Sequence, residues 1–443
     1  MLRKFLLSII CLCCFIFLGV PAMADQATEK LQERIDKLEG ELKLLLKGQE
    51  RAREEDKALV KSIEGKVEKV EKKAEEAATR VLSGFRFKPY GYIKLDAVYD
   101  DSRTNYGNFI LYVQPETTRN DDNEFNMTAR QTRIGLDILA PESSNWEARG
   151  RIEIDFYGDG SVQHENKAEP LLRHAFLEMK KGGFSILAGQ TFDLISPLVP
   201  DVLNYTVGWA GGNIGYRRPQ LRVTNIYPLA EFSKLSMALA IARTHGTMNE
   251  DLGIGGENDG EDVGFPTVQG RLALTTKLLT KKDTVFGISG HYGKEEIDWS
   301  GTKQGRIKSW SVNGDFDLPL SDRVSVKGEI FIGSNLDDYF GGIGQGVNAT
   351  TQTAIKTMGG WMQVGYQHSK KWKYNVGLGI DDPRNDDLTF GMRDRNSFYY
   401  GNVMFNLIAP VTIGLEYSYW ETGYLNQCSG TDNRVQTSII YNW

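Results

Sequence analysis

The sequence predicts an all-β fold, a 16-stranded antiparallel transmembrane β-barrel preceded by an N-terminal α-helical coiled coil. Three observations support this fold class. The chain opens with a secretory signal, alternation of apolar and polar residues recurs about sixteen times after residue 85, and short connections between these segments alternate with long ones. The predicted parts are a signal peptide (1–24), a coiled-coil segment (25–81) and a barrel (82–443).

Residues 1–24 have the three parts of a signal peptide. Arg3 and Lys4 give a basic start, an apolar run follows, and the closing tripeptide AMA fits the small-residue rule for cleavage after Ala24. The alternative is an uncleaved membrane anchor, but the apolar run is shorter than the roughly 20 residues that a helical span needs. No other stretch reaches about 18 continuous apolar residues, so we expect no helical membrane span.

Charge and cysteine content narrow the class of protein. The chain has 52 basic and 58 acidic residues, a net charge of −6, and loss of two basic residues with the signal leaves 50 against 58, or −8. We therefore expect no nucleic acid partner. Three of the four cysteines leave with the signal, so Cys428, in the last predicted outer loop, remains alone and no disulfide can form within one mature chain.

The segment 25–81 is rich in Glu, Lys, Ala and Leu, and it contains no proline. Its apolar residues are spaced by four and three in two blocks, separated by QERAREED, which indicates a coiled coil with a stutter. One helix cannot bury so narrow a stripe, so we expect an oligomer. The alternatives are a solvated single helix and a flexible linker. The stripe consists of Leu31, Ile35, Leu38, Leu42, Leu45, Val60, Ile63, Val67, Val70, Ala74, Ala77 and Val81.

After residue 85, segments with period-two alternation predict strands. Each is close to the length of about 9 to 11 residues that a tilted strand needs to cross a bilayer. The predicted strands are 89–100, 128–139, 146–157, 171–180, 183–191, 214–226, 233–243, 268–278, 284–292, 306–318, 323–333, 358–368, 372–381, 396–408, 411–422 and 433–443.

The connections favour a membrane barrel over a large secreted β protein. Short connections such as APESSN, KKGG and LPLSDR alternate with long ones at 101–127, 193–213, 245–267 and 334–357. A soluble sandwich has no reason to sort its connections, whereas a barrel has tight periplasmic turns and long extracellular loops. An even number of strands also leaves both chain ends in the periplasm, where the coiled coil can lie in water.

Apolar rows such as the one from Leu235 to Ile241 supply a lipid-facing surface. Trp146 and Trp372 lie toward strand ends, as in the aromatic girdles of membrane barrels. A closed sheet pairs every backbone group where no water is available. The final segment RVQTSIIYNW ends on Trp443 and is similar to the terminal signal of outer-membrane barrels, so we expect recognition by the barrel-assembly machinery.

The inward row is expected to be basic at the narrowest part of the pore. Charged and apolar residues alternate in WEARGRIEIDFYG, and the charges stay hydrated in an aqueous lumen, while Glu153 and Asp155 fall nearer the outer mouth. A focused positive potential attracts anions, and guanidinium groups bind carboxylate or phosphate oxygens in pairs. Alternatively, these cations pair with acids such as Asp96, Asp137 and Glu147 and only organise the wall. The substrate-guiding candidates are Lys94, Arg133, Arg149, Arg151, Arg218 and Arg222.

The long segment at about 193–213, DLISPLVPDVLNYTVGWAGGN, is less polar than the other predicted outer loops. An apolar loop exposed to water would be unusual, so we expect it to fold inward and narrow the pore opposite the basic row. The alternative is a loop packed at a subunit interface. The predicted constriction-loop residues are Leu194, Pro197, Tyr205 and Trp209.

Besides the signal and the coiled coil, the chain contains the motifs GYIKLDAVYD, TARQTRIGLDI, LAGQTFDLISP and YRRPQLRVT. Together these features resemble the DcaP-like outer-membrane porins, and the outer loops are not part of the resemblance. It implies a homotrimer of channels that takes up small organic anions, typically dicarboxylates including aromatic ones. By position it also implies roles for Arg133, Arg218 and Arg222.

The sequence therefore predicts a porin of the bacterial outer membrane, with no enzymatic activity, cofactor or metal. The five histidines are scattered without metal-ligand spacing, and the outward rows lack the Ser and His pair that a barrel phospholipase would need. A phosphate-selective porin and a structural tether from the outer membrane to the cell wall remain as alternatives. The expected partners are two further copies of the chain, outer-membrane lipid and lipopolysaccharide, and small anionic solutes.

Overall fold

The computed structural model describes residues 25–81, 84–116, 122–141, 143, 145–158, 167–244, 263–300 and 303–443. The predicted signal peptide lies outside the described residues. The chain divides into two compact units, Met1–Ser83 and Gly84–Trp443, and each is described by itself.

In the first unit the structure describes one helix, α2 (Asp25–Val81). The side chains of its apolar stripe that the structure describes are exposed, with Leu38, Leu45 and Val70 each showing more than half of their surface. A coiled coil needs partner helices, so the coiled coil stays a prediction. In the described part of the chain, no helix combines the length and the apolar character needed to cross a membrane.

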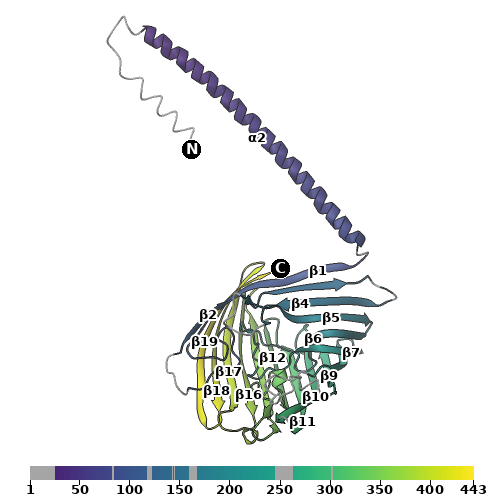
Figure 1. The fold of residues 1–443 in the computed structure, drawn as a ribbon. Helices are drawn as coiled ribbons and strands as arrows, with labels where there is room; N and C mark the ends of the chain where they lie inside the picture. The colour runs from purple at the N-terminus through teal and green to yellow at the C-terminus, as the bar shows by residue number, and fades with distance from the viewer. Residues whose placement is uncertain are drawn as a thin grey trace. The chain divides into compact units, whose positions relative to one another are not determined.

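The second unit is a closed barrel of sixteen antiparallel strands (Figure 1), which confirms the predicted fold class for this part of the chain. The first strand, β1 (Arg86–Asp100), pairs with the last, β19 (Gln427–Asn442), and this pairing closes the sheet. On its other side β1 pairs with β2 (Glu124–Thr128) and β3 (Arg133–Leu139), which are two halves of one barrel strand. A turn closed by the Thr132 amide and the Ala129 carbonyl separates the halves, where the sequence predicted one continuous strand.

Each remaining barrel strand pairs with its neighbours in chain order. These strands are β4 (Glu147–Asp155), β5 (Leu171–Lys181), β6 (Phe184–Phe192), β7 (Arg217–Ala230), β8 (Ser233–Ala242), β9 (Thr267–Thr276), β10 (Thr284–Ser300), β11 (Lys303–Pro319), β12 (Val324–Ser334), β15 (Lys356–Gln367), β16 (Trp372–Pro383), β17 (Arg393–Ile408) and β18 (Val411–Tyr424). The long connections also hold a small hairpin, β13 (Val347–Asn348) and β14 (Thr353–Ala354), and two short helices, η2 (Asp337–Tyr339) and η3 (Asn385–Asp387).

The alternation of short and long connections is less strict than the sequence suggested. Strands β18 and β19 extend beyond their predicted ends and meet in a tight turn, in which Asn426 has a positive φ of 56°. Asparagine tolerates this conformation better than most residues. Cys428 therefore lies in β19, with an exposed side chain, and not in an outer loop as predicted.

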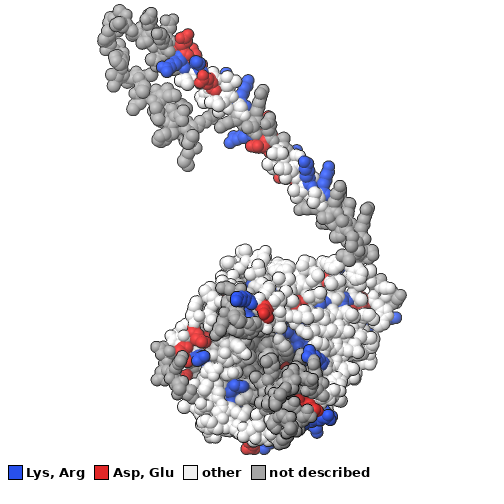
Figure 2. Space-filling model, viewed as in Figure 1, with Lys and Arg blue, Asp and Glu red and all other residues white. Residues whose placement is uncertain are grey.

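Period-two alternation separates the outer and inner faces of the barrel. In β12, Ile330 and Ile332 are exposed on the outer face, whereas Glu329 and Phe331 are buried on the inner face. Figure 2 shows wide uncharged areas over the strands. Such a surface is stable in contact with lipid, and the strands bury their polar rows inside.

The apolar core lies inside the barrel. In one cluster, Ile110 and Val113 of the connection after β1 pack against Phe398, Tyr400 and Trp420. A second cluster joins the connection after β6 to the connection after β12, and it consists of Ile195, Ile214, Phe331, Leu336 and Tyr339. Burial of each large apolar side chain contributes roughly 1.5 to 3 kcal/mol, so these connections form a folded filling within the lumen.

Candidate constriction site

The connection between β6 and β7, here called the lumenal loop (residues 193–216), is attached to the inner face of the barrel. Its backbone amides donate hydrogen bonds to buried side chains of the wall, from Leu198 to Glu329 at 2.7 Å and from Leu203 to Glu416 at 2.8 Å. A buried loop needs acceptors for its N–H groups, and the inward acids supply them. Glu329 and Glu416 therefore hold the loop and are not exposed to the water of the pore.

A carboxylate near the middle of the lumenal loop binds two cations of the wall. Asp201 Oδ2 lies 2.9 Å from Lys373 Nζ and 3.3 Å from Lys327 Nζ, and it accepts a hydrogen bond of 2.7 Å from Gln363. Burial by itself would raise the pKa of Asp201, but Lys327 and Lys373 hold this pKa below its ordinary value. The carboxylate thus stays charged and fixes the loop.

Lys94, a predicted substrate-guiding residue, lies buried beneath the lumenal loop. Its Nζ donates hydrogen bonds to the Leu203 carbonyl at 2.7 Å and to Gln131 Oε1 at 2.6 Å, and it lies 3.2 Å from Asp96 Oδ1. This placement corresponds to the alternative to substrate guiding, in which Lys94 organises the wall and the loop.

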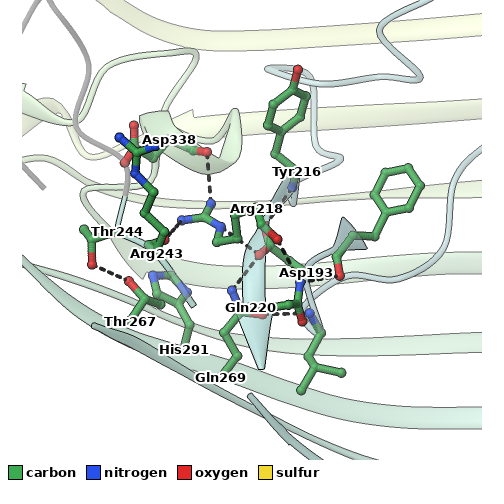
Figure 3. A network of polar contacts seen from close by, with 12 residues as sticks. Asp193, Tyr216, Arg218, Gln220, Arg243, Thr244, Thr267, Gln269, His291 and Asp338 are labelled. Atoms are coloured by element: carbon green, nitrogen blue, oxygen red, sulfur yellow. Dashed lines mark hydrogen bonds and ion pairs between the residues drawn. The ribbon is translucent and has the colours of Figure 1, made fainter. Parts of the chain in front are cut away.

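Arg218, a second predicted residue, forms the centre of a network between loops and wall. Arg218 Nε lies 2.8 Å from Asp193 Oδ1, and both side chains are fully buried, at 0% and 1% exposed. Asp193 also accepts a hydrogen bond of 2.6 Å from Gln269, and the Arg218 guanidinium donates to the Asp338 carbonyl at 3.3 Å. Figure 3 shows Arg218 pointing toward both Asp193 and Asp338. Arg218 therefore joins the lumenal loop to the loop that follows β12.

Two arginines share two acids on the wall that faces the lumenal loop. Arg173 donates hydrogen bonds of 2.8 Å to both Glu153 and Asp155. Arg133, a predicted residue, lies 3.6 Å from Glu153 and 4.0 Å from Asp155, and its side chain is 22% exposed. The predicted inward row is therefore basic at this part of the wall, but Glu153 and Asp155 balance the charges of the two arginines.

Arg173 was not among the predicted residues because a β-bulge changes its direction. The pairing of β4 with β5 shifts by one residue between Glu153 and Ile154, opposite Arg173. A bulge re-aims the side chain that it inserts. Regular alternation places His174 inward, and nothing in the local sequence indicates the extra residue.

Arg149 and Arg151 are the predicted residues nearest to the short turns, and both have acidic partners. Arg151 makes a bidentate contact with Asp137, with distances of 2.7 and 2.9 Å. Arg149 lies 2.7 Å from Glu178 and is 44% exposed. Both keep part of their surface open to the lumen, since Arg151 is 30% exposed.

Arg222, the last predicted basic residue, bonds to neutral groups. Its guanidinium donates to the Phe192 carbonyl and, at 3.0 Å, to Gln220 Oε1. Arg222 lines a cavity of about 660 Å³ together with Arg86, Arg149 and Lys180, and the acids Glu147 and Glu178 line it as well. Basic side chains therefore continue from the middle of the barrel toward the short turns.

A second cavity, of about 280 Å³, separates the basic wall from the lumenal loop. The wall strands contribute Arg133, Arg173 and Arg217 to its lining. Of the predicted loop residues, Pro197, Tyr205 and Trp209 line it, together with Val199 and Ile214. Leu194 is buried and is not part of this lining, and its backbone amide donates a hydrogen bond of 2.8 Å to Gln269 Oε1. This cavity is called the constriction cavity below.

Stacked rings hold the loop side of the constriction cavity in place. Tyr205 stacks on Tyr157 with ring centroids 3.9 Å apart, and Trp209 stacks on Phe340 at 4.5 Å. Burial raises the pKa of Tyr205, so its phenol stays neutral. The loop therefore presents a firm, largely apolar surface to the arginines.

Arg217 is, with Arg173, a residue that the sequence prediction missed, although it adjoins Arg218 in YRRPQLRVT. Its guanidinium lies 4.4 Å from the Tyr216 ring centroid and 5.5 Å and 5.9 Å from those of Phe192 and Trp209. It opens β7, where alternation places it outward, and the aromatic rings of the loop turn it toward the cavity. The only local signal is a second arginine at the junction of loop and strand.

A family model described as DcaP outer membrane protein matches residues 20–243, half of the chain. The chain belongs to the DcaP outer membrane protein family. This member of the family is accordingly a channel of the bacterial outer membrane, and the proteins that it resembles are channels and not enzymes. No curated protein matches it.

Solved structures show the same fold in other channels. The outer membrane channel DcaP of Acinetobacter baumannii has a TM-score of 0.65 at 19% identity, over 82% of this chain and 98% of that one. OmpF of Salmonella typhi, solved with daunomycin, has 0.55 at 14% identity, over 81% and 98%. An anion-selective porin from Comamonas acidovorans has 0.52 at 10% identity, over 81% and 100%. At these identities the likeness concerns the fold alone.

Proposed function

We propose that this channel mediates the passive diffusion of small organic anions, in particular dicarboxylates including aromatic ones. One observation carries the proposal, namely that three arginines of the wall strands and a largely apolar surface of the lumenal loop line the same constriction cavity. Arginines bind carboxylate oxygens in a bidentate manner, and an apolar surface favours a hydrocarbon body between two charged ends.

The same cavity argues against phosphate as the preferred solute. Phosphate is polar on every side, and it gains most from donors that surround it. Pro197 and Val199 offer no side-chain donor, and Val199 is 42% exposed. An anion that has both a charged end and an apolar face fits this arrangement better than phosphate does.

We assign the predicted basic residues to two roles. Arg133, Arg149, Arg151 and Arg222 guide anions, because they are only partly covered or line a cavity along the wall. Lys94 and Arg218 hold the loops, because both are buried and bonded to loop carbonyls. Pro197, Tyr205 and Trp209 form the apolar side of the path.

Reversal potentials in planar bilayers test the proposal. With a gradient of potassium succinate or phthalate, the potential should indicate anion preference, and phosphate should permeate less well. Arg133→Gln should weaken this preference, whereas Lys234→Gln, an exposed lysine 4.0 Å from Asp283, is the matched control. A cation-selective wild-type channel, or equal permeation by phosphate and phthalate, would contradict the proposal.

We also propose that the channel is a homotrimer whose helices α2 associate in the periplasm, with the long loops extracellular. The exposed stripe of α2 supports association, because an isolated helix leaves these residues in water. Native mass spectrometry in detergent should give three chains, and deletion of residues 25–81 should weaken the association. The channel without residues 25–81 should still conduct ions. If the protein were instead a tether to the cell wall, this deletion would impair the integrity of the cell envelope.

The outer face and the last residue suggest the remaining partners. We propose that the apolar outer rows contact outer-membrane lipid and lipopolysaccharide, and that Trp443 is read by the barrel-assembly machinery. The Trp443 backbone pairs with Gly91 of β1 through two hydrogen bonds of 3.1 Å, and its side chain remains 47% exposed. Trp443→Ala should lower the yield of assembled barrel in the outer membrane.

A further inference from the structure

Most cations that face the pore are balanced by an acid. The pairs differ in burial, but in each the opposite charges lie within 4.0 Å of one another, so the pair contributes little potential at a distance. The balanced cations include Lys94 with Asp96, Arg133 and Arg173 with Glu153 and Asp155, Arg149 with Glu178, Arg151 with Asp137, and Arg218 with Asp193.

Arg217 differs from all of these. Its side chain is only 2% exposed, yet within the described part of the chain it forms no ion pair, and its Nε, Nη1 and Nη2 have no hydrogen-bond partner. The adjacent Arg218 is equally buried but binds Asp193 at 2.8 Å. Two neighbouring arginines therefore have opposite electrostatic situations, one neutralised and one not.

The surroundings of Arg217 keep its charge without cancelling it. Three rings, of Phe192, Trp209 and Tyr216, lie within 6 Å of its guanidinium and attract the cation through their π faces. Aromatic rings have no net charge, so the field of the cation persists in the adjoining constriction cavity. That field is weakly screened, because the rings exclude water from the guanidinium.

We propose that Arg217 determines the anion preference of the constriction, while its neighbour Arg218 serves to hold the loops. This inference rests on the proposed function and assigns its selectivity to one residue. The uncompensated charge raises the local concentration of anions in the constriction cavity. The arginines of the balanced pairs around it orient the carboxylate groups of these anions. Arg222, whose described partners are neutral, continues the positive potential toward the short turns.

The test compares charge-removing and charge-keeping variants at one position. Arg217→Gln should lower the anion-to-cation permeability ratio about tenfold, as expected for loss of a focused potential. Arg217→Lys keeps the charge and should retain most of the ratio. The matched control is the double variant Arg306→Gln with Glu296→Gln, which removes a balanced pair of 2.8 Å that does not line the constriction cavity and should leave the ratio unchanged.

The remaining outcomes separate this inference from the proposed function. If the wild-type channel prefers cations, the proposed function fails. If the wild-type channel prefers anions and Arg217→Gln has the same permeability ratio, only the role of Arg217 is refuted. Removal of an unpaired buried charge should also leave folding intact, so an Arg217→Gln protein that fails to form a heat-resistant barrel would show a structural role and would overturn the inference as well.

Discussion

Replacement of Arg218 by alanine should loosen the attachment of the lumenal loop. At the observed 2.8 Å, and with an effective dielectric constant of about 20, the attraction between Arg218 and Asp193 is about 6 kcal/mol. Desolvation of both groups offsets part of this, and loss of one partner from a buried pair costs about 3 to 5 kcal/mol. Asp193 keeps its bonds from Gln269 and from the Tyr216 amide, so we expect the lower value, about 3 kcal/mol.

Urea unfolding in detergent, followed by tryptophan fluorescence, measures this loss of stability. A double-mutant cycle with Asp193→Ala should show that the double variant loses less than the two single variants together. A loop that is released should also widen the pore and raise the single-channel conductance. Arg384→Ala, at an exposed pair with Asp386, should behave as wild type. An Arg218→Ala channel within about 1 kcal/mol of wild type and with unchanged conductance would refute the reasoning.

Three further substitutions test the loops. The pKa of Asp201 is lowered in the folded channel. Its stabilising contribution is therefore present above about pH 4 and is lost as the pH falls through the lowered pKa. Asp201→Asn should remove this acid sensitivity from the urea midpoint. Burial raises the pKa of Asp338 in the folded channel. Its stabilising contribution is therefore present below about pH 4 and is lost as the pH rises through the raised pKa. The Asp338→Asn channel should keep its urea midpoint at high pH. Gly212 has a φ of 117° and a Cβ there would collide with a backbone carbonyl of β15, so Gly212→Ala should cost about 2 kcal/mol or more. Asp386→Asn for the pH series, and Gly150→Ala, whose Cβ meets no atom closer than 3.6 Å, are the controls that should change nothing.

Each of these expectations has a distinct contradicting result. A urea midpoint of the wild-type channel that is flat from pH 3 to pH 7 would exclude the role given to Asp201. Equal loss of stability at high pH in wild type and Asp338→Asn would exclude the role of that carboxyl. A Gly212→Ala barrel as stable as the Gly150→Ala barrel would show that the lumenal loop can move away from β15.

The strands could be predicted because lipid imposes one rule on every one of them. Residues such as Ile330 and Glu329 alternate between hydrocarbon and the interior, and period two identifies both the element and its inner face. Strand lengths were predicted less well at β18 and β19, which extend past their predicted ends and meet in the tight turn at Asn426.

The inner arrangement could be predicted only in part, because it depends on loops. The apolar composition of residues 193–213 indicated an inward fold, but no pattern shows that Glu416 and Lys94 hold the loop. The sequence identified basic residues, yet it could not distinguish Arg218, which has an acid beside it, from Arg217, which has none described. That difference arises from contacts between segments far apart in the chain.

The attachments of Leu198 and Leu203 to the wall have a consequence for how such channels diversify. Both use the main chain of the loop as donor and a wall carboxylate as acceptor, so the anchors are indifferent to which side chains the loop carries at those points. Substitutions on the loop can therefore remodel the filter while the scaffold that carries it stays the same. A change of the transported solute then requires new side chains on the loop and leaves the barrel unchanged.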